Sequence, residues 1–258
     1  MNDKLNSKVT AFFQLTKLAN AIGNRIWMYE NEEAWRKKRG LPPMHYEAEE
    51  KELIKTIFGD LETNWEGLKK KKEVLQRELE AMGKETKIWC NWLRDVKGVG
   101  GASAAVIECK LMPKEFPSRS HLQMYLGYGT IQGKAPKKER GKTMNYNHTL
   151  RAYFWNIGEC LVRSTGKYYE YYLKMKEKYI KKYAEQFKIE NKEAKKNMHP
   201  KHIDKMARRK MTKLFISHLW EEMYRAKYPD KQVPKPMHFK DVPMRDSEII
   251  KPFRDNNV

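Results

Sequence analysis

A short run of glycines and small residues carries the clearest chemical signal in this chain. Val96-Lys97-Gly98-Val99-Gly100-Gly101 precedes Ala102-Ser103-Ala104-Ala105, a pattern typical of a helix-hairpin-helix, in which a tight turn joins two helices. Glycine permits such a turn because it accepts positive φ and has no Cβ. The turn leaves backbone amides at the start of the second helix, where they can hold one phosphate without reading sequence. We therefore predict nucleic-acid contact through Lys97, Gly98, Gly100, Gly101 and Ser103; the alternative is an ordinary loop between two helices.

A second candidate contact is the basic segment further along the chain. Its predicted contact residues are Lys134, Lys137, Lys138, Arg140, Lys142, Asn147 and Arg151. The cations could neutralise phosphates, and Tyr146 or His148 could stack on the bases of a single strand. The alternative is a solvated loop on a basic protein. Lys201, Lys205, Arg208 and Arg209 form a basic helix face, which is more often the solvent side of a helix.

The charge balance favours an anionic partner. Lys and Arg total 53 against 33 Asp and Glu, a formal net charge of +20. Because like charges repel, this excess points to DNA, with RNA as a variant, and a membrane surface is the competing anion. No apolar run is long enough to span a bilayer, and the pattern of the first residues leads us to expect no signal peptide. We therefore expect no membrane and a cytoplasmic location.

The metal-ligating residue types are scattered. Cys90, Cys109 and Cys160 lie far apart with no C-x-x-C pair, which excludes a standard zinc ribbon and fits small buried thiols in a reducing cytoplasm. His199 and His202 make only half of a metal site, because Asp204 is the sole nearby partner. We expect no metal and no cofactor.

The elements that must position these residues are nearly all helices. We predict an all-α chain with a long helical hairpin or coiled coil at residues 1–84, a helical domain at 85–228 and an extended tail at 229–258. Apolar residues alternate in steps of four and three from Ile54 to Met82, a heptad seam. The seam could pair with a second copy or with the helix at residues 5–30; we favour a homodimer through residues 54–82.

Residues 93–225 resemble the C-terminal domain of the DEDD transposases of insertion sequences, relatives of the Piv invertase. The hairpin of that family, P-G-I-G-x-x-x-A, is similar to Lys97–Ala104. Its F-x-S-x-x-x-L-x-x-Y-L-G-L motif is similar to Phe116–Tyr128, and its basic loop and G-N-x-x-L-R motif are similar to Gly133–Arg151. Three motifs in the same order imply a helical DNA-handling domain.

The departures from the family define the expected function. The family carries an N-terminal RuvC-like nuclease domain with four carboxylates, whereas the first 90 residues here read as helix. The family's loop serine has no counterpart between Ser120 and Ser164, and Thr130 is a poor substitute. We therefore expect a non-enzymatic, largely nonspecific DNA-binding protein of a mobile element, plasmid or virus. The alternative is a nuclease or recombinase with an unrecognised active site, although carboxylates such as Asp60, Glu62 and Asp95 lack a pattern that would place them together around Mg²⁺.

Overall fold

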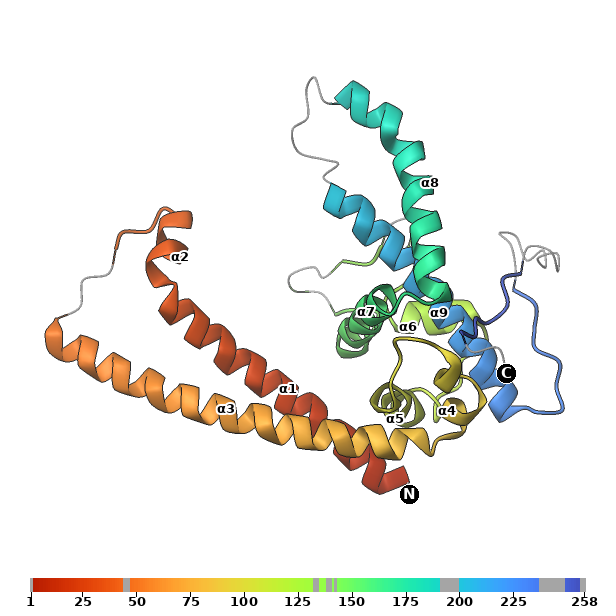
Figure 1. Cartoon of the computed structure of the whole chain (residues 1–258), viewed down its shortest axis with the longest axis horizontal. Helices are drawn as coiled ribbons and strands as arrows, with labels where there is room; N and C mark the ends of the chain where they lie inside the picture. Colours follow the sequence, from red (N-terminus) through yellow and green to blue (C-terminus); the bar gives the residue numbers. More distant parts are fainter. Residues whose placement is uncertain are drawn as a thin grey trace. The chain divides into compact units, whose positions relative to one another are not determined.

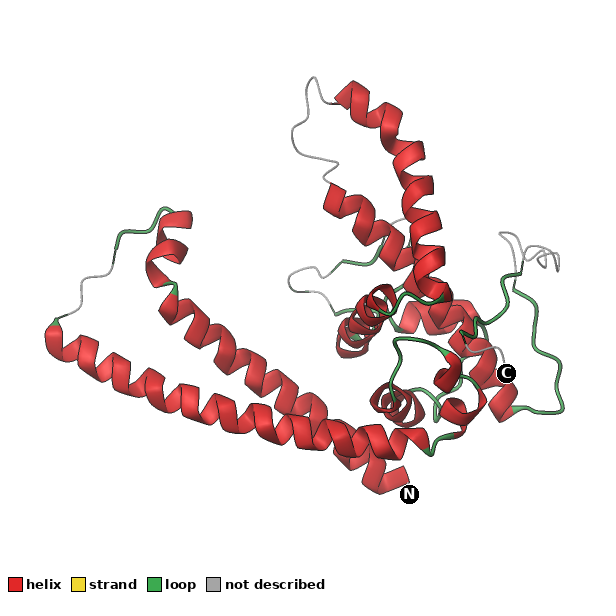
Figure 2. Cartoon of the chain, viewed as in Figure 1, coloured by secondary structure: helices red, strands yellow, loops and turns green. Residues whose placement is uncertain are grey.

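The computed structural model describes residues 2–43, 47–131, 135–137, 141, 143–190, 200–236 and 249–255. Within these ranges the regular elements are helices and no β-strand is present (Figure 2), which confirms the predicted all-α class. No helix within them is both long and apolar enough to cross a membrane. The chain divides into two compact units, Met1–Met82 and Gly83–Val258; Figure 1 labels their helices.

The first unit contains α1 (Asn2–Glu30), α2 (Glu32–Lys38) and most of α3 (Ala48–Lys84). Helices α1 and α3 run antiparallel (Figure 1). Tyr29, near the end of α1, stacks on Phe58, near the start of α3, with ring centroids 3.9 Å apart. Lys8, near the start of α1, forms an ion pair with Glu78, near the end of α3. These two contacts fix the direction of the pair.

The heptad seam of α3 is visible in which side chains are covered. The residues of the pattern from Ile54 to Met82 are buried or half-buried, whereas most positions between them are exposed. Lys72, the polar member of the pattern, lies over the ring of Phe12 of α1, with its Nζ 5.9 Å from the centroid. The seam therefore packs on the first helix of the same chain, which is the alternative to the favoured pairing of residues 54–82 with a second copy.

Helix α9 (Pro200–Lys227) is the central element of the second unit. It packs against α4 (Lys87–Asn91), α6 (Arg119–Tyr125), α7 (His148–Arg163) and α8 (Lys167–Glu190). Phe215 of α9 is fully buried, and its ring centroid lies 5.5 Å from that of Trp92, 6.3 Å from that of Phe154 and 5.4 Å from that of Tyr168. This aromatic cluster joins segments far apart in the sequence into one core. The short η1 (Leu93–Asp95) and α5 (Gly101–Lys110) complete the unit.

The three cysteines do not form a buried set. Cys90 and Cys160 are exposed and Cys109 is half-buried, so the prediction of buried thiols is wrong for two of the three. In α4 and α7 the inward positions are taken by the larger apolar side chains Ile88 and Leu161. Burial raises the pKa of the Cys109 thiol above its usual value.

Several buried carboxylates of the second unit are paired with arginines. Glu221 and Glu222 of α9 are each 5% exposed. Arg119 of α6 donates to Glu221 at 2.8 Å, and Arg225 pairs with both glutamates at 2.5 Å. Arg254 reaches Asp95 at 2.7 Å. Since an unpaired buried charge is costly, these ion pairs hold α6 to α9 and the chain around residue 254 to the segment of Asp95.

The segment 249–255 is docked on the second unit. The indole nitrogen of Trp92 donates to the Phe253 carbonyl at 3.0 Å, and Nε2 of His218 donates to the Ile250 carbonyl at 2.9 Å. The described part of the predicted tail contains no helix. The structure nevertheless groups it with the second unit instead of separating it at residue 229.

Candidate nucleic-acid interface

The glycine turn between η1 and α5 depends on Gly98. Its φ is +91°, a left-handed conformation that favours glycine. A Cβ at Gly98 would lie 2.6 Å from Ser164 Oγ and 2.8 Å from the carbonyl oxygen of Cys160. Ser164 Oγ also donates to the Lys97 carbonyl at 3.0 Å. The turn is therefore held against the end of α7, and only glycine fits at its tip.

The N-terminus of α5 has no side-chain cap. Gly100 occupies the N-cap position with φ −97° and ψ 172°, an extended conformation open to any residue, and α5 has no acidic residue in its first turn. Of the glycines in the turn, Gly98 alone has positive φ. The partial positive charge at this helix end is thus not offset by an acidic residue of α5 itself, as a phosphate site requires.

A carboxylate of the same chain already lies at this turn. Oδ2 of Asp255 accepts a hydrogen bond from the Lys97 amide at 2.7 Å, and Oδ1 accepts one from the Lys167 amide at the start of α8 at 2.6 Å. The Asp255 amide donates to the Asp95 carbonyl at 2.6 Å. The Lys97 amide is therefore occupied by an internal anion, whereas the Lys97 side chain is exposed.

Gly101 and Ser103 both have internal contacts. Gly101 is buried. Its carbonyl oxygen packs closely on Gly83, because a Cβ added at Gly83 would lie 1.7 Å from that oxygen. Ser103 Oγ accepts a hydrogen bond from the Tyr153 hydroxyl of α7 at 3.4 Å. Both predicted contact residues thus help to pack α5 against its neighbours.

The predicted basic segment is described only in part. Lys134, Lys138, Arg140 and Lys142 lie outside the described residues, and Lys137 is exposed. Asn147 is the N-cap of α7, because its Oδ1 accepts from the Leu150 amide at 3.0 Å, and its Nδ2 donates to the Tyr125 hydroxyl at 3.3 Å. Asn147 therefore positions the start of the helix that carries Arg151.

Four cations of α7 and α9 form a positively charged site in the second unit: Arg151, Arg209, Lys210 and Lys213, here called the cationic cluster. Among the described residues no carboxylate pairs with any of them. Burial and the Arg151 guanidinium lower the pKa of Arg209. Burial, Lys210 and Arg209 lower the pKa of Lys213. Burial is the larger cause of both lowered pKa values, and neighbouring positive charge is the smaller one, which a bound anion would relieve.

Neutral carbonyls and aromatic rings hold the two arginines of the cluster. Arg209 donates to the Gly127 carbonyl at 3.3 Å and to the Gly129 carbonyl at 3.0 Å. Arg151 donates to the Pro136 carbonyl at 2.9 Å and lies 4.7 Å from the centroid of the Tyr146 ring. Their positions are fixed while their charge remains, which suits binding of a phosphate.

A groove continues from the cluster along α9. It has a volume of about 750 Å³ and includes Lys210 and Lys213 in its lining. Further lining residues supply hydroxyl groups or positive charge: Ser118, Ser120, Ser217, Arg119 and Lys235. We call it the basic groove. Hydroxyls and lysines are the groups that commonly contact a phosphate backbone.

Sequence reasoning found part of this site. Arg151 is one of the predicted contacts of the basic segment, whereas Arg209 belongs to the basic helix face that the sequence assigns to solvent. Arg208, the neighbour of Arg209, pairs instead with Glu159 and with Asp204, the latter at 3.0 Å. Lys210 and Lys213 were missed; their spacing of three residues on α9 beside Arg209 is the signal that could have found them.

Comparisons of the chain with protein-family models, curated proteins and solved structures found no match. The resemblance to the transposase domain therefore remains a prediction from the motifs.

Proposed function

We propose that this protein binds nucleic acid, DNA in the first instance, through the phosphate backbone and largely without sequence preference. The cationic cluster carries the proposal: four positive side chains lie together, and no carboxylate among the described residues pairs with them. Positive side chains that lie together for structural reasons alone are normally paired with carboxylates of the same protein. The net charge of +20 supports the same class of partner.

The glycine turn is the second proposed contact. The uncapped N-terminus of α5 and the exposed Lys97 side chain support it. The Lys97 amide is not part of the proposed contact, because it already donates to Asp255. The predicted contacts of the basic segment join the same proposal through Arg151 and Lys137.

We further propose a non-enzymatic role in the cytoplasm, in a mobile element, plasmid or virus, in line with the transposase-like motifs. The alternative is a nuclease or recombinase. Incubation of labelled DNA with the protein and Mg²⁺ or Mn²⁺ separates the two, because an enzyme yields products and a binding protein yields a shifted, intact band.

We propose that two copies associate through the first unit. Leu53, Ile57 and Val74 of α3 are 62%, 49% and 53% exposed. Each directly precedes a residue of the heptad seam, so all three lie on one flank of that seam. A second copy would bury this apolar flank and widen the two-helix pair into a four-helix bundle.

The test of DNA binding replaces two lysines of the cluster. Lys210→Glu with Lys213→Glu should weaken binding to a blunt DNA duplex by at least tenfold, because it removes two phosphate contacts and adds repulsion (about 1.4 kcal/mol per tenfold). Lys174→Glu with Lys178→Glu on α8 is the matched control, since both lysines are exposed and the charge change is the same. The control should change the affinity by less than about threefold.

Salt dependence gives an independent readout. If about five phosphates are neutralised, log affinity should fall with log salt with a slope of about −4 to −5, and the cluster variant should have a shallower slope by about one to two. Equal losses in the two double variants would show a general charge effect and contradict a site at the cluster. An affinity that is independent of salt would refute the electrostatic proposal.

A further inference from the structure

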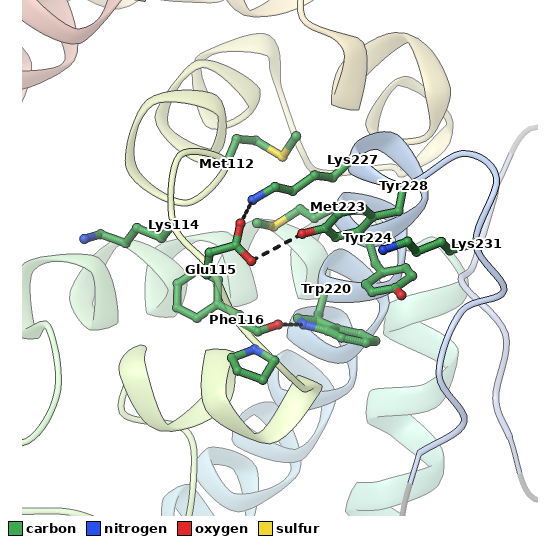
Figure 3. A pocket seen from close by; sticks show the side chains of 11 residues that line it. Met112, Lys114, Glu115, Phe116, Trp220, Met223, Tyr224, Lys227, Tyr228 and Lys231 are labelled. Atoms are coloured by element: carbon green, nitrogen blue, oxygen red, sulfur yellow. Dashed lines mark hydrogen bonds and ion pairs between the residues drawn. The ribbon is translucent and has the colours of Figure 1, made fainter.

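A surface cavity of about 220 Å³ lies between the end of α9 and the segment that follows α5 (Figure 3). Its apolar floor is Trp220 and Met223, which are 3% and 7% exposed. Phe116, Tyr224 and Tyr228 line it and are half-buried. Ligand pockets for whole drug-sized molecules are about 300 Å³ or larger, so this one suits a single planar ring system.

The aromatic side chains of the cavity are held in position. Trp220 and Tyr224 of α9 and Tyr228, the residue that follows its end, are spaced four residues apart, and successive ring centroids lie 5.3 and 4.9 Å apart. The indole nitrogen of Trp220 donates to the Phe116 carbonyl at 2.8 Å. The Tyr228 hydroxyl donates to Glu115 at 3.3 Å. Figure 3 shows both interactions as dashed lines. Rings fixed in this way lose little entropy when another ring stacks on them.

The rim of the cavity is positively charged. Lys114, Lys227 and Lys231 line it with a single carboxylate, Glu115. Lys227 forms an ion pair with Glu115. Among the described residues no carboxylate pairs with Lys114 or with Lys231, whose Nζ lies 4.8 Å from the centroid of the Tyr228 ring. An occupant therefore combines a flat apolar body with a negative charge.

We propose that this cavity receives an unpaired base of single-stranded nucleic acid, with the adjoining phosphates at Lys114 and Lys231. The proposal rests on the proposed function and adds a preference for unpaired bases. Trp220 lines both this cavity and the basic groove, so the two sites adjoin on α9. From Lys213 to Tyr224 the helix rises about 16 Å. A strand lying along the groove would thus bring a base to the aromatic rings a few nucleotides from the cationic cluster.

The test compares single strands with blunt duplexes of one sequence. Tyr224→Ala with Tyr228→Ala should weaken binding of the single strand about tenfold or more, as loss of base stacking does, and change duplex affinity by less than about threefold. The wild type should quench the fluorescence of 2-aminopurine placed in the single strand, and the variant should not. Circular dichroism confirms that helix content is kept.

Two controls isolate the rings of the cavity. Tyr228→Phe keeps the ring and loses its hydroxyl, so its single-strand affinity should stay near that of the wild type. Tyr179→Ala with Tyr183→Ala removes two tyrosines at the same spacing on α8, whose centroids are 6.3 Å apart, and should have no such effect.

The outcomes separate this inference from the proposed function. Unchanged single-strand affinity and quenching in the Tyr224/Tyr228 variant, or equal loss for single strand and duplex, would overturn the base pocket while duplex binding stands. A wild type that binds duplex but no single strand would do the same. A wild type that binds neither would overturn both.

Discussion

At the scale of single residues, Gly98 differs from Gly100 although both belong to the same glycine turn. Gly98 has φ +91° and faces Ser164 and Cys160, whereas Gly100 is extended. The sequence predicts the turn, because glycines at this spacing favour one. It does not predict which glycine is indispensable, since the answer depends on the end of α7, more than sixty residues further along the chain.

The change Gly98→Ala should destabilise the protein by about 2 kcal/mol or more, because a non-glycine residue is strained at positive φ and its Cβ would collide with a backbone carbonyl. Urea unfolding followed by circular dichroism measures the loss. Gly100→Ala is the matched control and should cost less, since its backbone conformation is allowed for alanine. Equal losses at the two positions would contradict this account.

In the cationic cluster, too, contacts with distant segments decide which residue is available, and the sequence does not predict them. Arg208 and Arg209 are neighbours in sequence, but Arg208 pairs with Glu159 and Arg209 binds the Gly127 carbonyl. Arg208 also pairs with Asp204, four residues earlier on α9, and spacing along that helix does indicate this pair. The Glu159 and Gly127 partners lie on other segments, so spacing along α9 does not predict them.

At the scale of elements, the heptad seam was predictable because its period is local. Which side chains of α3 are covered follows from the steps of four and three. The identity of the covering helix does not follow, because α1 and a second α3 offer similar apolar stripes. The stacked pair of Tyr29 and Phe58 shows the pairing with α1.

Two variants of α3 distinguish its two surfaces. Leu53 and Ile57 lie on the exposed flank. The variant Leu53→Lys with Ile57→Lys should therefore convert a dimer into a monomer in light scattering, without loss of helix.

Leu68 and Leu75 lie on the half-buried seam. The variant Leu68→Glu with Leu75→Glu should lower the free energy of unfolding by about 2 kcal/mol or more, because charges enter an apolar contact.

The control for the seam is Lys70→Glu with Arg77→Glu, at the same spacing on the exposed side of α3. It should change stability by less than about 0.5 kcal/mol per residue. A wild type that is monomeric at micromolar concentration would disprove the proposed dimer and leave the pairing of α1 with α3 intact.

At the scale of the whole chain, the sequence predicts a separate tail after residue 229, because prolines are frequent there and helical periodicity is absent. The structure docks residues 249–255 on the second unit through Trp92, His218 and the turn at Lys97. Sequence patterns within a short window cannot predict these contacts, because each hydrogen bond joins two residues that are far apart in the sequence.

His218 makes this docking dependent on pH. Its Nε2–H donates to Ile250, so Nδ1 accepts from the Tyr168 hydroxyl at 2.7 Å and the ring is neutral. Burial lowers the pKa of His218 from 6.5 to about 4. The unfolded chain therefore binds a proton at a higher pH than the folded chain. The contribution of His218 to stability is complete above pH 6.5 and is lost as the pH falls towards 4, up to about 3 kcal/mol.

Urea unfolding between pH 7 and pH 4.5 measures this loss, with His218→Gln as the non-titrating reference. The difference between wild type and variant removes the carboxylate contributions common to both, such as that of Glu222, whose pKa is raised by burial. That difference should shrink as the pH falls. A difference that is constant with pH would contradict the assignment to His218.

The hydrogen bonds of Trp92 and Lys97 to the docked segment join parts of the chain that are far apart in sequence. Trp92 and Phe253 are 161 residues apart in sequence, and Lys97 and Asp255 are 158 residues apart. Contacts of such separation are slow to form, because closing a long loop costs chain entropy before the contact contributes. A fragment cut to the glycine turn and its two helices would leave the Trp92 indole and the Lys97 amide without these partners. We therefore expect a fragment that contains the turn to fold on its own only when it extends through Asp255, however short the motif itself is.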